Sequence, residues 1–226
     1  MLRNIVRKEL ILNRKTLAFT AIPYVGWFAY VLRQPDLTAG EYLVMSATMA
    51  VFYQVVLFVR DDKLKTAALT CSLPVTRTVV VRARYLVACS LSASWIGAAI
   101  LLALACPWSH VPLARLVAPS SLGVAASIAL LGTAILFPLV MRFGLIGVLA
   151  FLVGMQVLGI VAFLAVDLLG RASSVNAVLS FLTRSIRVLH ANLGHPGFAL
   201  MWTLMVLAIV AGSYGLSVWL YGRRDL

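Results

Sequence analysis

Residues 118–167 have the sequence APSSLGVAASIALLGTAILFPLVMRFGLIGVLAFLVGMQVLGIVAFLAVD, in which only Arg142 and Asp167 are charged. A helix that crosses the hydrocarbon of a bilayer needs about 20 mainly apolar residues, and this stretch is long enough for two such helices. The corner Met141–Arg142–Phe143 would separate them, because a charged side chain is costly in hydrocarbon. The stretch therefore predicts a tight hairpin of two membrane-spanning helices.

The rest of the chain has the same character. It has 226 residues, of which 62% are hydrophobic and 12% are charged, whereas about 25% of the residues of a soluble domain are charged. There is too little polar surface to cover a water-exposed globule, so the bilayer must be the solvent for most of the chain. We expect an all-α, polytopic membrane protein in which residues 1–226 form one transmembrane domain of about six spans. The expected spans are 16–32, 42–59, 85–107, 118–140, 144–167 and 197–221.

The distribution of Lys and Arg predicts the orientation of these spans. Short loops that are rich in Lys and Arg are retained on the cytoplasmic side of the membrane. If the N-terminus is cytoplasmic, most of the 19 Lys and Arg residues fall on that side, chiefly within 1–15 and 60–84. Both termini are therefore expected in the cytoplasm, with the chain in the inner membrane.

The net charge of +12 is compatible with nucleic-acid binding, for which a basic stripe is the usual footprint. The basic residues, however, occupy short segments between apolar runs, without a groove-reading motif or interleaved aromatic residues. No nucleic-acid partner is expected. The cysteines have neither CxxC nor metal-ligand spacing, so neither a disulfide nor a metal site is expected. They are Cys71, Cys89 and Cys106.

Two segments at the membrane surface are predicted to be helical. Residues 1–15 place apolar residues at helical spacing between cations, which favours an interfacial helix, although an ordinary basic flank is equally compatible. Residues 173–190 have one apolar stripe, with a cap at Ser173 or Ser174 and an end at Gly194–Pro196. They predict an extracytoplasmic helix before the last span, either a membrane-surface connector or a cover over a pathway mouth.

Residues 60–84 form the longest segment expected on the cytoplasmic side and have the sequence RDDKLKTAALTCSLPVTRTVVVRAR. Asp61 and Asp62 can cap the start of a short helix, because carboxylates accept from its free N–H groups. Pro74 would end that helix, since proline has no N–H and disfavours helix at the preceding residue. Thr76 can cap the helix that follows. A short helix flanked by cations is suited to contact with a cytoplasmic partner.

Polar side chains inside the expected spans are candidates for function. Such groups are costly in hydrocarbon and usually face the interior of a bundle. Gln54 lies in the second expected span, Gln156 in the fifth, and Asp167 at the outer end of the fifth. We take these three residues as candidates for lining a pathway. Pro138 is expected to kink the fourth span, and the glycines and serines of the spans are expected to permit close helix packing.

The sequence contains no paired carboxylates, nucleophile elbow or P-loop. The chain is therefore not expected to be an enzyme, and no catalytic residue is assigned. A proton or ion relay would need several acidic residues within the spans, and only Asp167 is near one. If the chain transports a substrate, another polypeptide must supply the energy. The apolar spans favour an amphipathic or hydrophobic substrate, such as a peptide, a drug or a lipid-like molecule.

Two stretches resemble the small ABC-2-type transporter permeases of bacteria, which are six-span half-permeases. The first is VRKELILNRK at residues 6–15, and the second runs from Asp61 through LPVTR at residues 73–77 to Arg84. The family pattern is an acidic residue, a leucine-rich turn, L-P-[VI]-[ST]-[RK], an apolar run and a lysine before the third span. This chain departs from it in having aspartate for glutamate and Arg84 for the lysine.

The resemblance implies the permease subunit of an ATP-binding-cassette exporter in a bacterial inner membrane. Such a subunit pairs with a second copy or a close paralogue to form the pathway and binds two ABC ATPase subunits. The ATPases use ATP and Mg²⁺, and this chain would bind no cofactor. The loop helix at about 62–74 would be a coupling helix seated in a groove on the ATPase. The residues implied for ATPase coupling are Asp61, Asp62, Lys63, Leu64, Lys65, Leu69, Pro74 and Arg77.

Two alternatives stay open at this point. The haem-exporter permease of cytochrome c maturation has a similar length, span count and acidic stretch, but it should show a haem-handling site, and no His lies within an expected span here. A non-transporting membrane scaffold or sensor subunit could also bind an ATPase. ATP-dependent vesicle transport would separate a transporter from a scaffold.

Overall fold

The structure is a computed structural model that describes the backbone of residues 18–63, 76–169 and 173–223, and the side chains of these except 61–63, 77, 162–169 and 173–195. The described residues form helices and contain no strand, which confirms the predicted all-α class. A helical segment Ala18–Val31 comes first. The helices that follow are α2 (Ala39–Lys63), α4 (Arg77–Ala105), α5 (Leu113–Leu116), α6 (Pro119–Phe143), α7 (Leu145–Leu169) and α8 (Ser173–Gly222).

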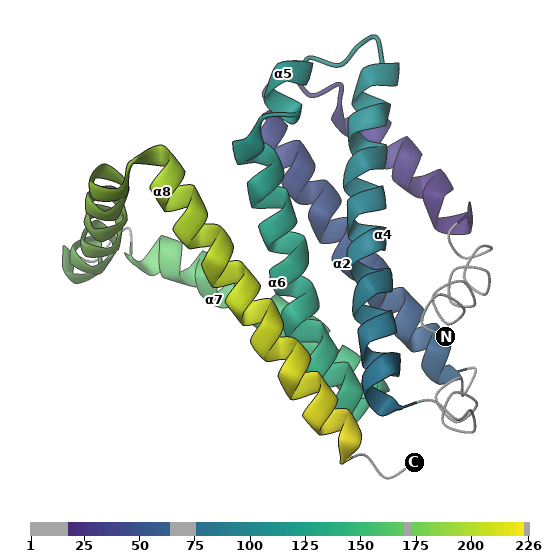
Figure 1. Ribbon diagram of the computed structural model, residues 1–226. Coiled ribbons are helices and arrows are strands. Elements are labelled where there is room, and N and C mark those ends of the chain that lie inside the picture. Colours follow the sequence, from purple (N-terminus) through teal and green to yellow (C-terminus); the bar gives the residue numbers. More distant parts are fainter. Residues whose placement is uncertain (1–17, 64–75, 170–172, 224–226) are drawn as a thin grey trace.

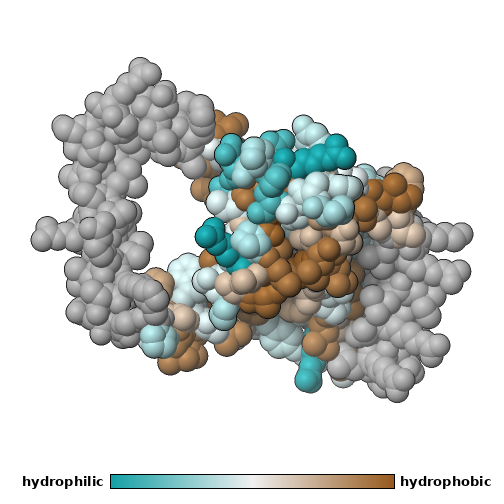
Figure 2. All heavy atoms as spheres, turned by 90° about the horizontal axis from the view of Figure 1, so that it is seen from above, coloured by the Kyte–Doolittle hydropathy of each residue, from teal (hydrophilic) through white to brown (hydrophobic). Residues whose placement is uncertain are grey.

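Helix α6 lies at the centre of the arrangement. It packs against α2 on one side and against α8 on the other, and α4 contacts both α2 and α8 (Figure 1). The short helix α5 lies at one end of this bundle, and α8 ends at the opposite end (Figure 1). Seen from the α5 end, hydrophilic residues gather on one part of the face, and hydrophobic residues lie directly beside them and at the edges (Figure 2). Many large hydrophobic side chains of α6, α7 and α8 are exposed, as in a helix bundle whose sides face lipid.

Two clusters of buried side chains hold the bundle together. The first joins Ala18–Val31, α2, α4, α5 and α6 towards the α5 end, and its members include Phe28, Leu32, Tyr42, Leu43, Trp95, Ala99, Leu116 and Ala125. The second joins the last turns of α2, α6 and α8 to the first turns of α4 and α7. Its members include Val55, Phe58, Val81, Tyr85, Leu136, Phe137, Met141, Val148 and Tyr221. The helices therefore alternate in direction, as successive membrane crossings require.

Among the described residues, four helices are long and apolar enough to cross a membrane: Ala39–Arg60, Thr78–Ala105, Pro119–Phe143 and Pro196–Gly222. They correspond to the second, third, fourth and sixth expected spans, so the chain is a multi-pass membrane protein. The first and fifth expected spans correspond to the shorter apolar helices Ala18–Val31 and Leu145–Val161. The count of six and the cytoplasmic placement of the termini stay predictions.

Two boundaries around the basic loop differ from the prediction. Helix α2 continues to Lys63, so Asp61 and Asp62 lie in its last turn, and the prediction that they cap a new helix is wrong. Neither Gly nor Pro occurs between Tyr53 and Lys63 to break the helix earlier. Thr76 is the N-terminal cap residue of α4, as predicted, although its side chain makes no capping hydrogen bond.

The start of α2 contains a signal that the sequence analysis missed. Thr38 and Glu41 form a capping box: the Thr38 N–H donates to Glu41 Oε2 at 3.0 Å, and the Glu41 N–H donates to Thr38 Oγ1 at 3.2 Å. The T-x-x-E spacing is visible in the sequence. It places the start of α2 at Ala39, before the expected start of the second span at residue 42.

The hairpin between α6 and α7 turns at Gly144 rather than at Met141–Arg142–Phe143. Helix α6 continues through Phe143, because Met141 is buried in the second cluster. Gly144 has φ 58° and ψ −128°, and its N–H donates to the Val140 carbonyl at 2.8 Å. Only glycine adopts this conformation without strain, so the first residue able to reverse the chain sets the corner.

Helix α8 begins at Ser173, and it does not end at Gly194–Pro196. It continues through Pro196 to Gly222 as a single helix of 50 residues, so the predicted end is wrong. A proline inside a helix removes one hydrogen bond and bends the helix without ending it when the flanking turns are held. Figure 1 shows α8 changing direction between its green first part and its yellow second part.

Candidate functional site

The residues predicted to contact an ATPase lie on and between α2 and α4. Asp61, Asp62 and Lys63 end α2, and Arg77 begins α4. Leu64, Lys65, Leu69 and Pro74 lie outside the described residues. The structure therefore describes the two helical stems of the predicted coupling segment.

Both stems pack on one aromatic ring of α6. The ring of Phe137 lies 5.0 Å from that of Phe58 near the end of α2, and 4.3 Å from that of Tyr85 near the start of α4. The Arg84 guanidinium lies over the Phe58 ring at 5.7 Å. A shift of either stem must therefore move Phe137 or lose its contact, because ring pairs at this distance are in van der Waals contact.

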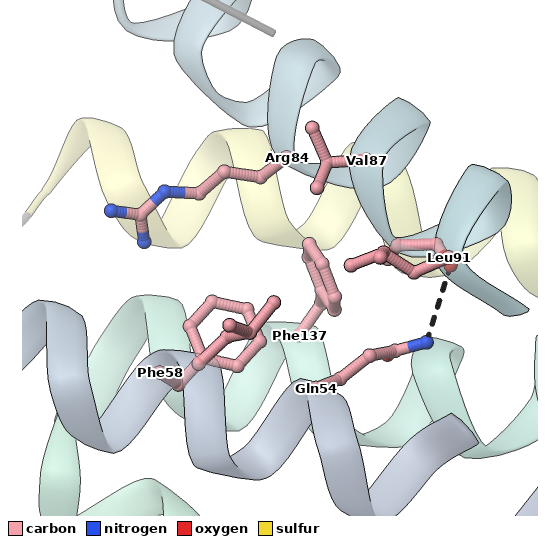
Figure 3. Close-up of a pocket in the computed structure, with 8 residues that line it drawn as sticks. Gln54, Phe58, Arg84, Val87, Leu91 and Phe137 are labelled. Atoms are coloured by element: carbon pink, nitrogen blue, oxygen red, sulfur yellow. Dashed lines mark hydrogen bonds between the residues drawn. The ribbon is translucent and has the colours of Figure 1, made fainter. Parts of the chain in front are cut away.

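Phe137 also borders a small cavity between α2 and α4. The cavity has a volume of about 30 Å³ and is lined at opposite ends by Arg84 and Gln54 (Figure 3). This volume can hold a water molecule, which is stable in a cavity only with polar partners. Arg84 and Gln54 are the polar residues among those that line it.

Gln54 is 2% exposed and joins three helices. Its Nε2 donates to Ser92 Oγ at 3.0 Å and to the Ala88 carbonyl at 3.4 Å, both on α4. Its Oε1 accepts from Thr133 Oγ1 of α6 at 3.1 Å. Within this chain the amide is thus an interhelix hydrogen-bonding group.

The other two pathway candidates lie elsewhere. Gln156 is exposed on α7, and Asp167 lies in the last turn of the same helix, with its side chain outside the described residues. The structure does not place the Gln54 and Gln156 side chains together within one chain.

A row of hydroxyl groups joins α4, α8 and α6 beside Phe137. The Tyr85 hydroxyl lies 2.8 Å from Ser213 Oγ and 3.0 Å from Ser217 Oγ. Ser213 Oγ donates to the Ala134 carbonyl at 2.6 Å. The sequence shows Pro138 and the serines at i and i+4 on the last helix, but not that they meet.

A larger cavity is an apolar groove of about 480 Å³ on the side of the bundle. Its walls come from Ala18–Val31 and α2, with one residue each from α4 and α7. Six aromatic side chains dominate it, a feature that the sequence analysis missed despite their i, i+3, i+4 spacing on the first helix. They are Tyr24, Trp27, Phe28, Phe52, Tyr53 and Trp95.

The inner wall of this groove is fixed by hydrogen bonds and ring contacts. The Tyr24 hydroxyl donates to the Trp95 carbonyl at 3.0 Å and lies 2.9 Å from Ser46 Oγ. The Tyr24 ring stacks on Phe28 at 4.3 Å and meets Trp95 at 4.2 Å. The Tyr24 hydroxyl is therefore directed to partners within the bundle.

Among the residues that the structure describes, no group of three metal-ligating side chains occurs.

A comparison with protein families identifies the chain. The family model of ABC-2 family transporter proteins matches residues 4–222, nearly the whole sequence. The chain belongs to the ABC-2 family of transporter proteins. A search of the curated proteins and a search of the solved structures found no match.

Membership of the ABC-2 family establishes the general class of this chain. It is a permease, the membrane component of an ABC transporter, and components of this kind are generally non-catalytic and associate with an ABC ATPase. The described apolar helices agree with this class.

Proposed function

We propose that this ABC-2 family protein is one half of the permease of an ATP-driven exporter in a bacterial inner membrane. Two copies, or one copy and a close paralogue, enclose the pathway, and two ABC ATPase subunits bind from the cytoplasm. The observation on which the proposal depends is the family match over residues 4–222. The packing of both stems of the basic segment on Phe137 supports it.

In this mechanism ATP is bound and hydrolysed by the partner ATPase subunits. The ATPases bind ATP and Mg²⁺ and close together, which moves the segment between α2 and α4. Asp61, Asp62, Lys63 and Arg77 set the docking geometry at its two stems. Leu64, Lys65, Leu69 and Pro74, outside the described residues, complete the contact. The movement shifts the permease towards an outward-open state, because the closed ATPases bind that state better.

The proposed substrate is amphipathic or hydrophobic. The aromatic groove supports this proposal, because its lining is uncharged and its volume of about 480 Å³ is within the range of small-molecule sites. Met49 and Phe52, on its α2 wall, lie near the middle of the span Ala39–Arg60. Molecules dissolved in the bilayer can therefore reach it at that depth. Gln54, Gln156 and Asp167 stay candidates for the pathway of the assembled dimer.

The second copy is supported by unfilled space beside glycines on α7 and α8. A Cβ atom built at Gly154, Gly159, Gly212 or Gly215 would meet no neighbouring atom within 4 Å, whereas one built at Gly132 would meet Val51. Glycines in membrane helices commonly permit the close approach of another helix. The exposed faces of α7 and α8 are therefore the surface that we assign to the second copy.

Photocrosslinking in cells tests the ATPase contact. A photoreactive amino acid is placed at Lys65 or Leu69, and in the control at Arg115 on α5, at the other end of the bundle. We expect crosslinks from residues 65 and 69 to a protein with a P-loop, and none from residue 115.

A transport assay tests the substrate class. Purified complexes in vesicles should move a lipophilic dye with ATP and leave a small hydrophilic solute untransported. Absence of an ATPase crosslink at 65 and 69 contradicts the proposal, and transport of hydrophilic solutes alone contradicts the proposed substrate class.

A further inference from the structure

The row of hydroxyls beside Phe137 lies at the weakest point of α6. Pro138 has no N–H, so the carbonyl four residues earlier, that of Ala134, loses its helical donor. Ser213 of α8 supplies a replacement, because its Oγ donates to this carbonyl at 2.6 Å. An interhelix bond therefore takes the place of a bond within α6 at the position where the helix can bend most easily.

The direction of every hydrogen bond in the row can be assigned. A carbonyl only accepts, so the one proton of Ser213 is used on Ala134. The contact of 2.8 Å between Tyr85 and Ser213 then requires the Tyr85 hydroxyl to donate to Ser213 Oγ. The contact of 3.0 Å between Tyr85 and Ser217 requires Ser217 to donate to Tyr85. The bonds run in one direction, from Ser217 through Tyr85 and Ser213 to the Ala134 carbonyl.

This row is sealed from solvent and from lipid. Tyr85 is 7%, Ser213 8% and Ser217 0% exposed. A buried hydroxyl that loses its partner pays the full cost of desolvation, so the row is either intact or replaced by another set of bonds. A two-state response of this kind is typical of elements that switch between two packings.

The row also lies close to the predicted ATPase contact. Tyr85 lies about 12 Å along α4 from Arg77, at 1.5 Å per residue. Its ring packs on Phe137, the residue before the proline, and Phe58 of α2 packs on the same ring. Motion of either stem of the basic segment therefore reaches α6 next to its missing hydrogen bond.

We propose that Tyr85 and Ser213 are positioning residues that pass movement of the α2 and α4 stems to α6 at Pro138 and to α8. With the row intact, the three helices move as one body. When the stems are displaced, the Tyr85–Ser213 bond opens, α6 bends at Pro138, and α8 separates from α4. This inference rests on the proposed function for the source of the movement, but the row and its effect on helix spacing belong to the chain alone.

The first test measures helix spacing on the purified permease in nanodiscs without any ATPase. Spin labels are attached at Phe143→Cys on α6, beyond the proline, and at Leu216→Cys on α8, in a background without the native cysteines. Both positions are exposed, at 54% and 47%. We expect Tyr85→Phe and Ser213→Ala to broaden the distance distribution. Ser213→Thr keeps a hydroxyl, so its distribution should be as narrow as that of the unsubstituted protein. The matched control is Tyr214→Phe, because the Tyr214 ring contacts Tyr85 while its hydroxyl is outside the row.

The second test uses the permease with its ATPase in vesicles and measures substrate moved per ATP hydrolysed. Tyr85→Phe and Ser213→Ala should lower this ratio about fivefold, the lower end of ordinary coupling between sites, with basal ATP hydrolysis unchanged. An unchanged distance distribution in both variants overturns the role of the row in positioning the helices. A broadened distribution with an unchanged ratio overturns its role in coupling. If no ATPase associates with the permease, the proposed function fails, and the distance measurement still decides whether the row holds α6 and α8 together.

Discussion

Thr133 Oγ1 lies 3.1 Å from Gln54 Oε1 and 2.7 Å from the Ala129 carbonyl, and its single proton is shared between these two acceptors. The contact with Gln54 ties α6 to α2, and the Gln54 amide continues to Ser92 on α4. One buried amide thus joins three membrane helices. In a bilayer the unfolded helices also find polar partners, so each such bond contributes only about 0.6 to 1.7 kcal/mol.

Gln54→Leu is therefore expected to lower the free energy of unfolding by about 1 kcal/mol, because it keeps the volume of the side chain and removes its hydrogen bonds. Unfolding in SDS–detergent mixtures, followed by circular dichroism, measures the change. Gln156→Leu is the matched control, since Gln156 is exposed on α7 and its loss should leave stability unchanged. Equal effects of the two substitutions would contradict the interhelix role of Gln54.

Gly147 permits the close approach of α7 to α6. A Cβ atom at this position would overlap the backbone carbonyl of Leu139, which cannot move away as a flexible side chain could. Gly147→Ala should destabilise the protein by about 1 to 3 kcal/mol, the usual cost of overpacking. Gly159→Ala is the control, because a Cβ there meets nothing within 4 Å. If thermal unfolding in detergent gives the same midpoint for both variants, the close α6–α7 contact is wrong.

Gly144 tests the position of the corner itself. Its φ of 58° with ψ of −128° is a conformation that costs a residue with a side chain about 1 to 3 kcal/mol. Gly144→Ala should therefore lower stability, while Gly123→Ala, near the start of α6 with open space around it, should not. The same unfolding assay compares the two. A neutral Gly144→Ala would place the chain reversal elsewhere, for example at Met141–Arg142–Phe143.

The comparison of sequence and structure shows which features are local. The length of an apolar run is set by the thickness of the hydrocarbon, so α2, α4, α6 and the Pro196–Gly222 part of α8 could be predicted. The T-x-x-E capping box at Thr38 is equally local and could have been found. The glycine that forms the corner, Gly144, is visible in the sequence, but the continuation of α6 past Arg142 depends on burial of Met141. The partners of Gln54 depend on tertiary packing and do not follow from the sequence near that residue.

The candidate site also has parts that the local sequence determines and parts that depend on tertiary packing. The basic segment could be recognised from its own residues, because charge and proline placement act locally. The link from Tyr85 to Ser213 joins residues far apart in the chain, and the aromatic groove needs the first helix to lie against α2. The sequence supplies the serines and rings, and only the fold shows which of them meet.

The aromatic groove can be tested as the site of substrate contact. Trp27 lines the groove and is half exposed. Trp27→Ala should therefore remove the contact between the indole ring and the substrate without creating a cavity in the core. We expect the KM for a lipophilic dye to rise about tenfold, the effect of losing one aromatic contact of roughly 1 to 1.5 kcal/mol. Phe19→Ala is the control, because Phe19 lies on the same helix, is exposed and is outside the lining. ATP-driven dye transport by vesicles measures both variants. If Trp27→Ala and Phe19→Ala transport the dye with equal KM, the groove does not contact the substrate, and the uncharged aromatic wall has to be assigned to lipid or to the second copy.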